Sequence, residues 1–364
     1  MKIYFDNVIF SLQRSGGISV YWYELLRRLL VSEHTVSLIE RPSALNSSLR
    51  RELVVPRQTE VRCERGPAQF ARLQAVRFPM TPGSIFHSSY YRTTVNTEVA
   101  RVATVHDFTY ERFRRGLSRF VHRLEKLRSL HAADGIICNS ESTRRDLSRF
   151  YPDLDPNRVR VIPMGVSENF QPLDRDRAMS EKLRPAIAAR YVLFVGDRRF
   201  YKNFPLAVRT LALLPEYSLV MVGGLPLAGT ERRLLDRLIA GRYRHVGVLD
   251  GGALNAVYNH AHCLLYPSRY EGFGIPVLEA MRAGCPTVVA ANSALIETSG
   301  SAGILVSSDD PQDWAQAVVS IENSELRNRL LTAGLRHADA YTWQRCYSET
   351  VDFYRDVHMK KFES

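Results

Sequence analysis

The sequence has few of the features that mark several protein classes. It has no paired cysteine spacing, which argues against a disulfide framework or a zinc site and indicates reduced thiols in a cytoplasmic protein. No apolar run approaches the ~20 residues of a membrane-spanning helix, so any membrane contact is expected to be peripheral. The first residues carry Asp6 within an apolar run and lack a small-residue cleavage site, so we expect a first strand and not a signal peptide. The five cysteines are Cys63, Cys138, Cys263, Cys285 and Cys346.

Acidic residues are the minority among the charged ones. The chain has 38 Asp and Glu against 49 Lys and Arg, which gives a net charge of +11. Such a surface attracts anions, whether nucleic acid, acidic lipid or phosphorylated substrates. The 45% apolar and 24% charged residues are typical of a globular protein, and 364 residues suit two α/β domains.

The most informative stretch is SRYEGFGIPVLEAMRAG, residues 268–284. It follows an apolar run of strand type, and Pro276 is placed as a first-turn residue of a helix that ends at Gly284. Glu271 then stands at the strand end, and Glu279 about one turn into the helix. We expect both carboxylates to face one crevice, where they can accept hydrogen bonds from sugar hydroxyls.

Between the two glutamates lies the loop Gly272, Phe273 and Gly274, followed by Ile275 at the start of the helix. Backbone amides of such a loop, together with the positive end of the helix, favour an anion and above all a phosphate. Two hydroxyl acceptors beside a phosphate site predict a sugar phosphate ligand. The alternative is an ordinary strand-loop-helix connection with an incidental carboxylate pair.

The glutamate pair eight positions apart, enclosing Gly-Phe-Gly-Ile-Pro and ending in Glu-Ala-Met, resembles the retaining glycosyltransferases of family 4. The resemblance implies an α/β fold of GT-B type, with two doubly wound Rossmann-like domains facing a central cleft. We expect an acceptor-binding domain at 1–170, a nucleotide-sugar-binding domain at 171–343, and a C-terminal helix at 344–364 that crosses back to the first domain. The inter-domain linker is placed within 167–190.

Donor contacts follow from the resemblance in the second half. After the strand Tyr191–Val195, the family grips the donor diphosphate with an arginine and a lysine. Lys202 matches the lysine; Asp197 occupies the usual arginine position, so we assign Arg198, with Arg199 in reserve. The loop from Val248 and Leu249 to Gly251 would hold the base through backbone groups, Glu271 the transferred sugar, and Glu279 the ribose. The alternative for the cations is an exposed loop position.

In the first half, Gly16 and Gly17 precede a helix, at a position where the family's first domain approaches the donor phosphates and the acceptor. The run 102–108 predicts a buried strand ending at His106 and Asp107, and a strand's carboxyl end borders the crevice of an open parallel sheet. The family has a histidine at the matching strand end, beside the transferred sugar. His106 could equally be a structural histidine bonded to Asp107, or have both roles.

Residues 112–131 combine regularly spaced apolar side chains with seven basic ones, including Lys126. A basic amphipathic helix can lie on an anionic membrane, and many acceptors of the family are lipid-linked. The alternative is a core-packed helix with a solvated basic face. Nucleic-acid binding is not expected, because no aromatic platform accompanies the basic residues.

No metal is expected. Asp153-Leu154-Asp155 and Asp174-Arg175-Asp176 each lie in a proline-bearing loop with no neighbouring ligands, and are interpreted as solvated turns. Lys202, Arg198 and the loop amides would instead stabilise the leaving diphosphate.

The sequence therefore predicts a retaining, metal-independent hexosyltransferase that needs a nucleotide sugar and no other cofactor. The opening residues and the segments HSSYY, TVHDFTYE and GDRRFYKNF look like bacterial mannosyltransferases of lipopolysaccharide O-antigen synthesis that use GDP-mannose. The partners are then the nucleotide sugar and a glycan or lipid-linked acceptor, at the inner face of the plasma membrane. Alternatives are a GDP-rhamnose or UDP-hexose donor, a GT-B nucleotide-sugar epimerase, or a non-enzymatic basic membrane adaptor.

Overall fold

The computed structural model describes residues 1–13, 16–66, 71–173 and 190–363, and of residues 117 and 118 only the backbone. The chain forms two compact units, Met1–Gly165 with Trp343–Ser364, and Val166–Thr342. The boundaries predicted from the sequence, after 170 and 343, lie slightly further along. The described part of the predicted linker packs in unit 2, where the backbone amides of Gln171 and Leu173 donate to Asn255 and Asn259.

Unit 1 is built on a seven-stranded sheet in the order β3-β2-β1-β4-β5-β6-β7, in which every pair is parallel. Its central strands are buried over nearly their whole length, as expected for parallel strands covered on both faces. The strands are β1 (Lys2–Asp6), β2 (Thr35–Glu40), β3 (Glu60–Cys63), β4 (Ile85–Ser88), β5 (Ala100–Val105), β6 (Gly135–Cys138) and β7 (Val159–Val161).

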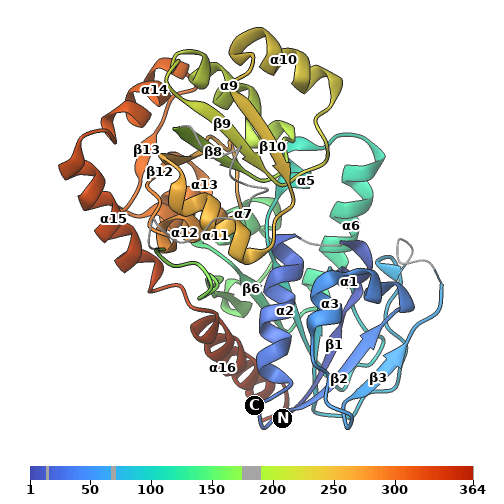
Figure 1. Ribbon diagram of the computed structural model, residues 1–364. Coiled ribbons are helices and arrows are strands. Elements are labelled where there is room, and N and C mark those ends of the chain that lie inside the picture. Colours follow the sequence, from blue (N-terminus) through green and yellow to red (C-terminus); the bar gives the residue numbers. More distant parts are fainter. Residues whose placement is uncertain (14–15, 67–70, 174–189, 364) are drawn as a thin grey trace. The chain divides into compact units, whose positions relative to one another are not determined.

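Nine helical segments, counted over the described residues, complete unit 1. Figure 1 shows the first helices in blue and the last helix, α16, in dark red beside α2. They are α1 (Val8–Leu12), α2 (Gly17–Leu29), η1 (Pro42–Asn46), α3 (Ser48–Glu52), α5 (Thr109–Phe113), α6 (Leu117–Ala132), α7 (Glu141–Phe150), η2 (Pro156–Arg158) and α16 (Trp343–Phe362).

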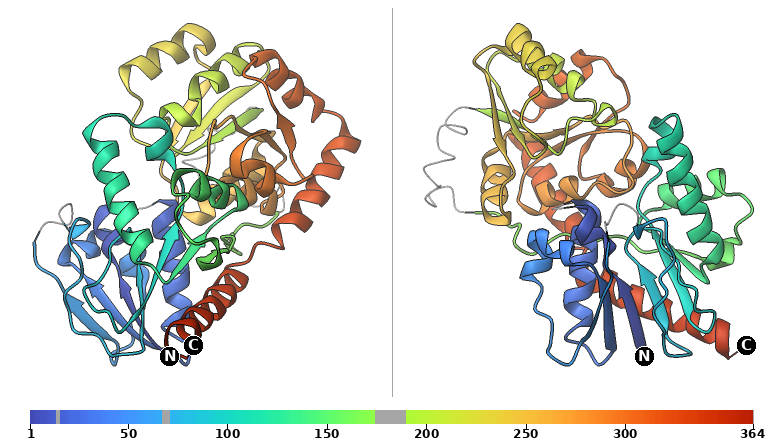
Figure 2. Two further views of the ribbon diagram at one scale, coloured as in Figure 1. Left: turned by 180° about the vertical axis from the view of Figure 1, so that it is seen from behind. Right: turned by 90° about the vertical axis from the view of Figure 1, so that its right-hand side faces the viewer.

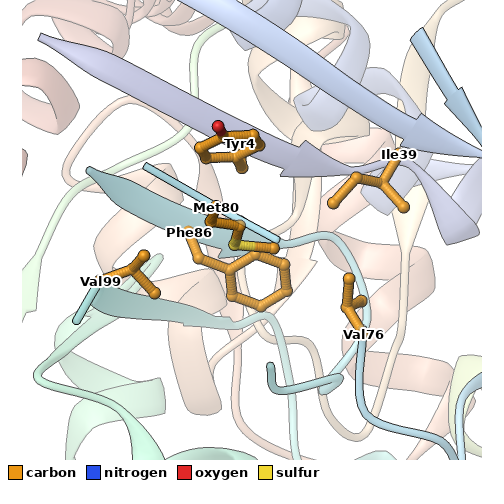
Figure 3. Packing of buried hydrophobic residues seen from close by; sticks show 6 residues of the cluster. All are labelled: Tyr4, Ile39, Val76, Met80, Phe86 and Val99. Atoms are coloured by element: carbon orange, nitrogen blue, oxygen red, sulfur yellow. The ribbon is translucent and has the colours of Figure 1, made fainter. Parts of the chain in front are cut away.

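One part of the unit 1 core lies against the face of β1, β2 and β4. Tyr4 of β1 is paired in register with Phe86 of β4, and side chains from the segments before β4 and β5 complete the cluster (Figure 3). The segment between β3 and β4 therefore contributes Val76 and Met80 to the core. The cluster consists of Tyr4, Ile39, Val76, Met80, Phe86 and Val99.

The last helix returns the chain to unit 1, as predicted. The hydroxyl of Tyr354 on α16 lies 2.6 Å from Nδ1 of His87 on β4, and Nε2 of the same histidine lies 2.9 Å from the hydroxyl of Thr104. Gly135 on β6 lies so close to α16 that a Cβ there would stand 2.5 Å from Val357. The helix thus packs directly on the sheet of unit 1.

Unit 2 has a six-stranded parallel sheet in the order β10-β9-β8-β11-β12-β13. Figure 2 shows helices on both faces of this sheet. The strands are β8 (Tyr191–Val195), β9 (Ser218–Val222), β10 (Tyr243–Gly247), β11 (Cys263–Tyr266), β12 (Thr287–Ala290) and β13 (Ile304–Val306). The helices are η3 (Phe200–Lys202), α9 (Phe204–Ala212), α10 (Gly229–Ile239), α11 (Gly251–His260), α12 (Ile275–Arg282), α13 (Ser293–Ser299), α14 (Pro311–Ser320) and α15 (Ser324–Ala338).

The predicted amphipathic helix at 112–131 is wrong in two respects. The chain breaks at Gly116, whose φ of +70° ends any continuous helix, and forms α5 and α6 instead. Phe120, one of the regularly spaced apolar side chains, is 64% exposed, whereas Lys126, one of the seven basic ones, is completely buried. Lys126 is held by Glu111 at 2.9 Å and by the carbonyl oxygen of Asp107 at 2.9 Å, so specific polar partners outweigh the hydrophobic pattern.

Candidate active site

The two glutamates of the central motif lie where the sequence predicts them. Glu271 stands in the loop between β11 and α12, and Glu279 lies on α12. The helix begins at Ile275 with proline in its first turn, and Gly284 (φ +71°) follows its end. The carboxyl edge of β11 and the first turns of α12 therefore carry both carboxylates.

Glu271 is joined directly to Lys202. The ammonium group of Lys202 lies 2.7 Å from Oε1 of Glu271 and donates to the hydroxyl of Tyr266 at 2.8 Å. Lys202 is the last residue of η3, which follows β8. Gly196, directly after β8, lies close to this lysine: a Cβ at Gly196 would stand 3.7 Å from Cε and Nζ of Lys202. Residues far apart in sequence thus form one cation-carboxylate-phenol group at the ends of neighbouring strands β8 and β11.

The charge of Lys202 is retained in this setting. Burial alone lowers the pKa of an ammonium group, but the Glu271 carboxylate, together with the nearby tyrosines, outweighs burial and holds the pKa of Lys202 well above its usual value. The Lys202 side chain is 12% exposed and that of Glu271 is 13% exposed. A cation kept charged with little solvent around it interacts more strongly with a phosphate than an exposed lysine does.

Glu279 has a different environment from Glu271. Its Oε2 accepts a hydrogen bond from the hydroxyl of Tyr258 on α11 at 2.9 Å. Burial raises the pKa of Glu279 to about 7, and this hydrogen bond opposes the rise only in part. The carboxyl is therefore near its titration midpoint at neutral pH.

The Gly-Phe-Gly loop between the glutamates is tightly supported. Gly274 is the N-cap of α12 with φ +107°, and a Cβ there would lie 2.7 Å from Leu295, so no other residue fits without displacement. Phe273 is buried; its ring lies edge-on to Tyr341, and its carbonyl oxygen accepts from the hydroxyl of Thr298 at 2.5 Å.

The two arginines do not join the Lys202 group. Arg198 is 4% exposed, its Nε lies 3.1 Å from the Glu231 carboxylate, and its terminal nitrogens donate to the carbonyl oxygens of Gly223 and Leu225. This guanidinium fixes the loop after β9, and its assignment as a diphosphate ligand stays a prediction. Arg199 has a 61% exposed side chain and pairs with Asp197 at 2.9 Å, the residue that occupies the family's usual arginine position.

The predicted base-binding loop follows β10. Val248 is 76% exposed, and Leu249 is half-buried. Asp250 then caps α11 by accepting from the amide of Ala253 at 2.8 Å. An exposed valine beside a capped helix end leaves an apolar surface on this loop.

In unit 1, His106 lies at the end of β5 and is 7% exposed. Neither ring nitrogen has a hydrogen-bond partner among the described residues, so the suggested bond to Asp107 is not formed. The backbone carbonyl of His106 accepts from Asn139 at 2.9 Å, and Tyr21 packs edge-on at 5.1 Å between ring centres. Burial lowers the pKa of His106 to about 4, so the imidazole is neutral at pH 7 with both nitrogens available to a ligand.

Gly16 and Gly17 begin α2. Gly16 is the N-cap in an extended conformation, and its carbonyl oxygen accepts from the Ser19 hydroxyl at 2.9 Å. The short helix α1, absent from the sequence prediction, separates this start from β1. The glycine pair therefore begins a helix, as predicted, but not directly after the strand.

The described residues contain no group of three or more His, Cys, Asp or Glu side chains that could hold a metal ion. Asp155 accepts from the amide of Asn157 in η2, and Asp153 lies 3.0 Å from His131. The second aspartate pair, at 174 and 176, lies outside the described residues.

Sequence reasoning missed Tyr258, Tyr266 and Ser293. The hydroxyl of Tyr266 bonds Lys202, that of Tyr258 bonds Glu279, and that of Ser293 accepts from the Glu271 amide at 3.0 Å. Both tyrosines lie in apolar patterns that predict burial, and a buried phenol needs a hydrogen-bond partner. This requirement could have indicated that both hydroxyls bond polar groups of the site. Nothing in the local sequence marks Ser293.

Comparison with known proteins identifies the class of this fold and site. The model "Glycosyltransferase Family 4" matches residues 15–170, and the model "Glycosyl transferases group 1" matches residues 177–336. The chain belongs to the glycosyltransferases of family 4, with two Rossmann-like units of GT-B type, and is a hexosyltransferase.

Among individual relatives, the chain is 26% identical to O-antigen chain mannosyltransferase B of Escherichia coli, covering 93% of this chain and 96% of the relative. It is 27% identical to a D-inositol 3-phosphate glycosyltransferase of Acidothermus cellulolyticus, over 94% and 86%. A sucrose-phosphate synthase from Thermosynechococcus elongatus has the same fold, with a TM-score of 0.77, 22% identity and coverage of 98% and 99%. HepE of Anabaena, solved with UDP-glucose, has a TM-score of 0.72, 15% identity and coverage of 98% and 100%.

Proposed function

We propose that the protein transfers mannose from GDP-mannose, with retention of anomeric configuration and without a metal ion, to a glycan or lipid-linked acceptor in bacterial O-antigen synthesis. The observation that carries the choice of sugar and pathway is the similarity to O-antigen chain mannosyltransferase B, which spans nearly the full length of both chains. The choice of GDP rests on the resemblance of the opening segments to bacterial mannosyltransferases that use GDP-mannose.

The site contacts support the reaction type. Cleavage of the sugar-phosphate bond increases negative charge on the departing diphosphate, and Lys202 is a retained cation 2.7 Å from Glu271. In this proposal Lys202 moves its contact to the diphosphate, and Glu271 then accepts hydrogen bonds from the transferred sugar. One preorganised donor of this kind is worth about 3 to 4 kcal/mol of barrier. A leaving phosphate oxygen takes the acceptor's proton, so no protein nucleophile is required.

The remaining residues have supporting roles. Glu279 binds the ribose hydroxyls, and the loop at Val248 and Leu249 borders the base. His106, whose ring nitrogens have no hydrogen-bond partner among the described residues, binds the transferred sugar. Arg198 binds the diphosphate if it exchanges its contact with Glu231 for the donor, and Arg199, which pairs with Asp197 at the surface, is the reserve.

A second donor has a specific observation in its favour. HepE was solved with UDP-glucose and shares the fold over nearly the whole chain, so a UDP-hexose donor is the alternative to test first. For the acceptor, the D-inositol 3-phosphate glycosyltransferase offers a phosphorylated polyol as the alternative. A non-enzymatic adaptor is set aside by the family match.

We also propose peripheral contact with the inner face of the plasma membrane through residues 112–131. Phe120 on α6 is 64% exposed, and the arginines at 115, 123 and 128 are exposed on the same segment. An exposed aromatic ring among arginines suits an anionic lipid surface. Within the described ranges, no helix has the length and apolar character needed to cross a bilayer.

The proposal is tested by a metal-free thermal-shift screen with GDP, UDP, ADP and their common sugar conjugates. We expect stabilisation by GDP and GDP-mannose that is lost in Lys202→Ala and Glu279→Ala and kept in Lys360→Ala, an exposed lysine on α16. Transfer from labelled GDP-mannose to O-antigen intermediates, with α-linked product by NMR, would complete the case. Selective stabilisation by UDP and its conjugates would replace the donor, and folded protein that responds to no nucleotide would refute the site.

A further inference from the structure

The loop that carries Glu271 is held from one side by the segment at the start of α13. The side-chain amide of Asn292 donates to the carbonyl oxygen of Ser268 at 3.0 Å, and the backbone amide of Glu271 donates to the hydroxyl of Ser293 at 3.0 Å. Further along α13, Thr298 donates to the carbonyl oxygen of Phe273. Three polar side chains of this segment therefore bind three successive points of the loop 268–274.

Ser293 makes its contact in an unfavourable backbone conformation. Its φ is +45°, and it is one of three residues other than glycine with positive φ among the described residues. Its hydroxyl also donates to Oδ1 of Asn292 at 2.9 Å, so both hydrogen-bonding roles of the hydroxyl are used. A strained non-glycine residue persists where the surrounding contacts compensate for it, and such strain gathers at functional sites.

The other side of the loop is attached to the lysine segment. The backbone amide of Arg269 donates to the carbonyl oxygen of Tyr201 at 2.7 Å, next to Lys202. The loop is thus fixed between the segment after β8 and the segment after β12. With both attachments, the Glu271 backbone is held where its carboxylate meets Lys202.

We infer that Ser293, supported by Asn292, is a positioning residue that fixes the Glu271 backbone for sugar transfer. The inference rests on the proposed function, because it assigns Ser293 a role in the same donor site. Ser293 acts through Glu271: its hydroxyl is already engaged by the Glu271 amide and by Asn292, and glycine would satisfy the backbone conformation without it. The hydroxyl, and not the backbone angle, is the feature that matters.

Two substitutions separate the hydroxyl from the backbone strain. Ser293→Gly removes the hydroxyl and relieves the positive φ, whereas Ser293→Ala removes the hydroxyl and keeps the strain. Ser299→Ala is the matched control, because Ser299 lies at the end of α13, is buried, and has no side-chain hydrogen-bond partner among the described residues. The measurements are hydrogen exchange of residues 268–274 without ligand, and kcat and KM with GDP-mannose.

We expect both Ser293 variants to exchange faster at 268–274 and to lose about 10- to 100-fold in kcat, with KM for the donor changed less than about threefold, because misplacement of a reacting group acts on turnover. Ser299→Ala should match wild type. A wild-type kcat in Ser293→Gly, or unchanged exchange in both Ser293 variants, would overturn the inference. If wild type transfers no sugar from any nucleotide donor, the proposed function fails separately, and the exchange measurement alone decides whether Ser293 fixes this loop.

Discussion

Glu279 should make nucleotide-sugar binding depend on pH near neutrality. Burial raises the pKa of this carboxyl to about 7 in the ligand-free protein, and the Tyr258 hydroxyl at 2.9 Å is its hydrogen-bond partner. Ribose hydroxyls are donors that favour the ionised carboxylate. Binding should therefore select the ionised form and release a proton wherever the free protein is protonated.

The magnitude follows from the size of the shift. The pKa rises from 4.5 to about 7, which corresponds to about 3 kcal/mol between the two protonation states. If the ribose hydroxyls return the pKa to its ordinary range, Kd should rise about tenfold for each pH unit below 7, reaching about 100-fold by pH 5. Above pH 8 the carboxyl is already ionised, so Kd should be constant.

The same shift predicts a stability effect of defined sign. The folded-state pKa lies above the unfolded one, so the folded protein binds the additional proton between these values. The stability contributed by protonated Glu279 is complete below pH 4.5 and is lost as pH rises through 7. Glu279→Gln should therefore match wild type near pH 4.5 and have a larger free energy of unfolding at pH 8.5, by at most about 3 kcal/mol.

Isothermal titration calorimetry with GDP-mannose from pH 5.5 to 8.5, in buffers of different ionisation enthalpy, measures both Kd and proton release. A nucleotide sugar is used because both phosphates are esterified, whereas the terminal phosphate of a nucleoside diphosphate titrates near pH 6. In Glu279→Gln, Kd should change with pH only through other titrating groups. In Tyr258→Phe, the midpoint of the change in Kd should move to higher pH, because the hydrogen bond that lowers the pKa of Glu279 is lost. A wild-type slope retained in Glu279→Gln, or no slope in wild type, would refute the reasoning.

Three further predictions concern the fold of unit 1, each measured by denaturant unfolding. Lys126→Met should cost about 3 to 5 kcal/mol because it leaves Glu111 buried without its cation, and adding Glu111→Gln should recover part of the loss; a cost below 1 kcal/mol would contradict a buried ion pair. Gly135→Ala should cost about 1 to 3 kcal/mol, because the new Cβ would stand 2.5 Å from Val357, and a neutral effect would mean that α16 moves freely. Ser140→Ala should cost about 1 kcal/mol through loss of the α7 N-cap, and an unchanged midpoint would exclude the cap.

The sequence was most predictive where apolar runs and turn residues act locally. Buried runs such as Tyr191–Val195 give strands without ambiguity, and Pro276 with Gly284 sets the limits of α12. By contrast, β2 and β3 were not predicted, and β3 is largely exposed, so its pattern carries little signal. The end of the predicted strand 102–108 was placed too late, because buried residues continue past Val105 into the loop that follows β5.

Site residues were predictable when the motif fixes the backbone, and not when side-chain pairing decides. Lys202 and Glu271 meet because β8 and β11 are neighbours in the sheet, a consequence of topology that the resemblance already implies. Arg198 and Arg199 are adjacent in the same loop, but Arg198 is buried and pairs with Glu231, whereas Arg199 is exposed and pairs with Asp197. Nothing in the local pattern tells which of two adjacent arginines pairs with Glu231 and becomes buried.

The two glutamates of the motif are chemically different because of what lies beside each of them. Glu271 is paired with a cation at 2.7 Å, so its carboxylate is compensated before any ligand arrives. Glu279 has a phenol as its partner, and burial raises its pKa to about 7. If a phosphate draws Lys202 away as proposed, Glu271 needs new hydrogen-bond donors, which sugar hydroxyls supply, whereas Glu279 first needs to lose its proton wherever it is protonated. Donor binding should therefore depend on pH through the protonation of Glu279, and on charge through the contact between Glu271 and Lys202.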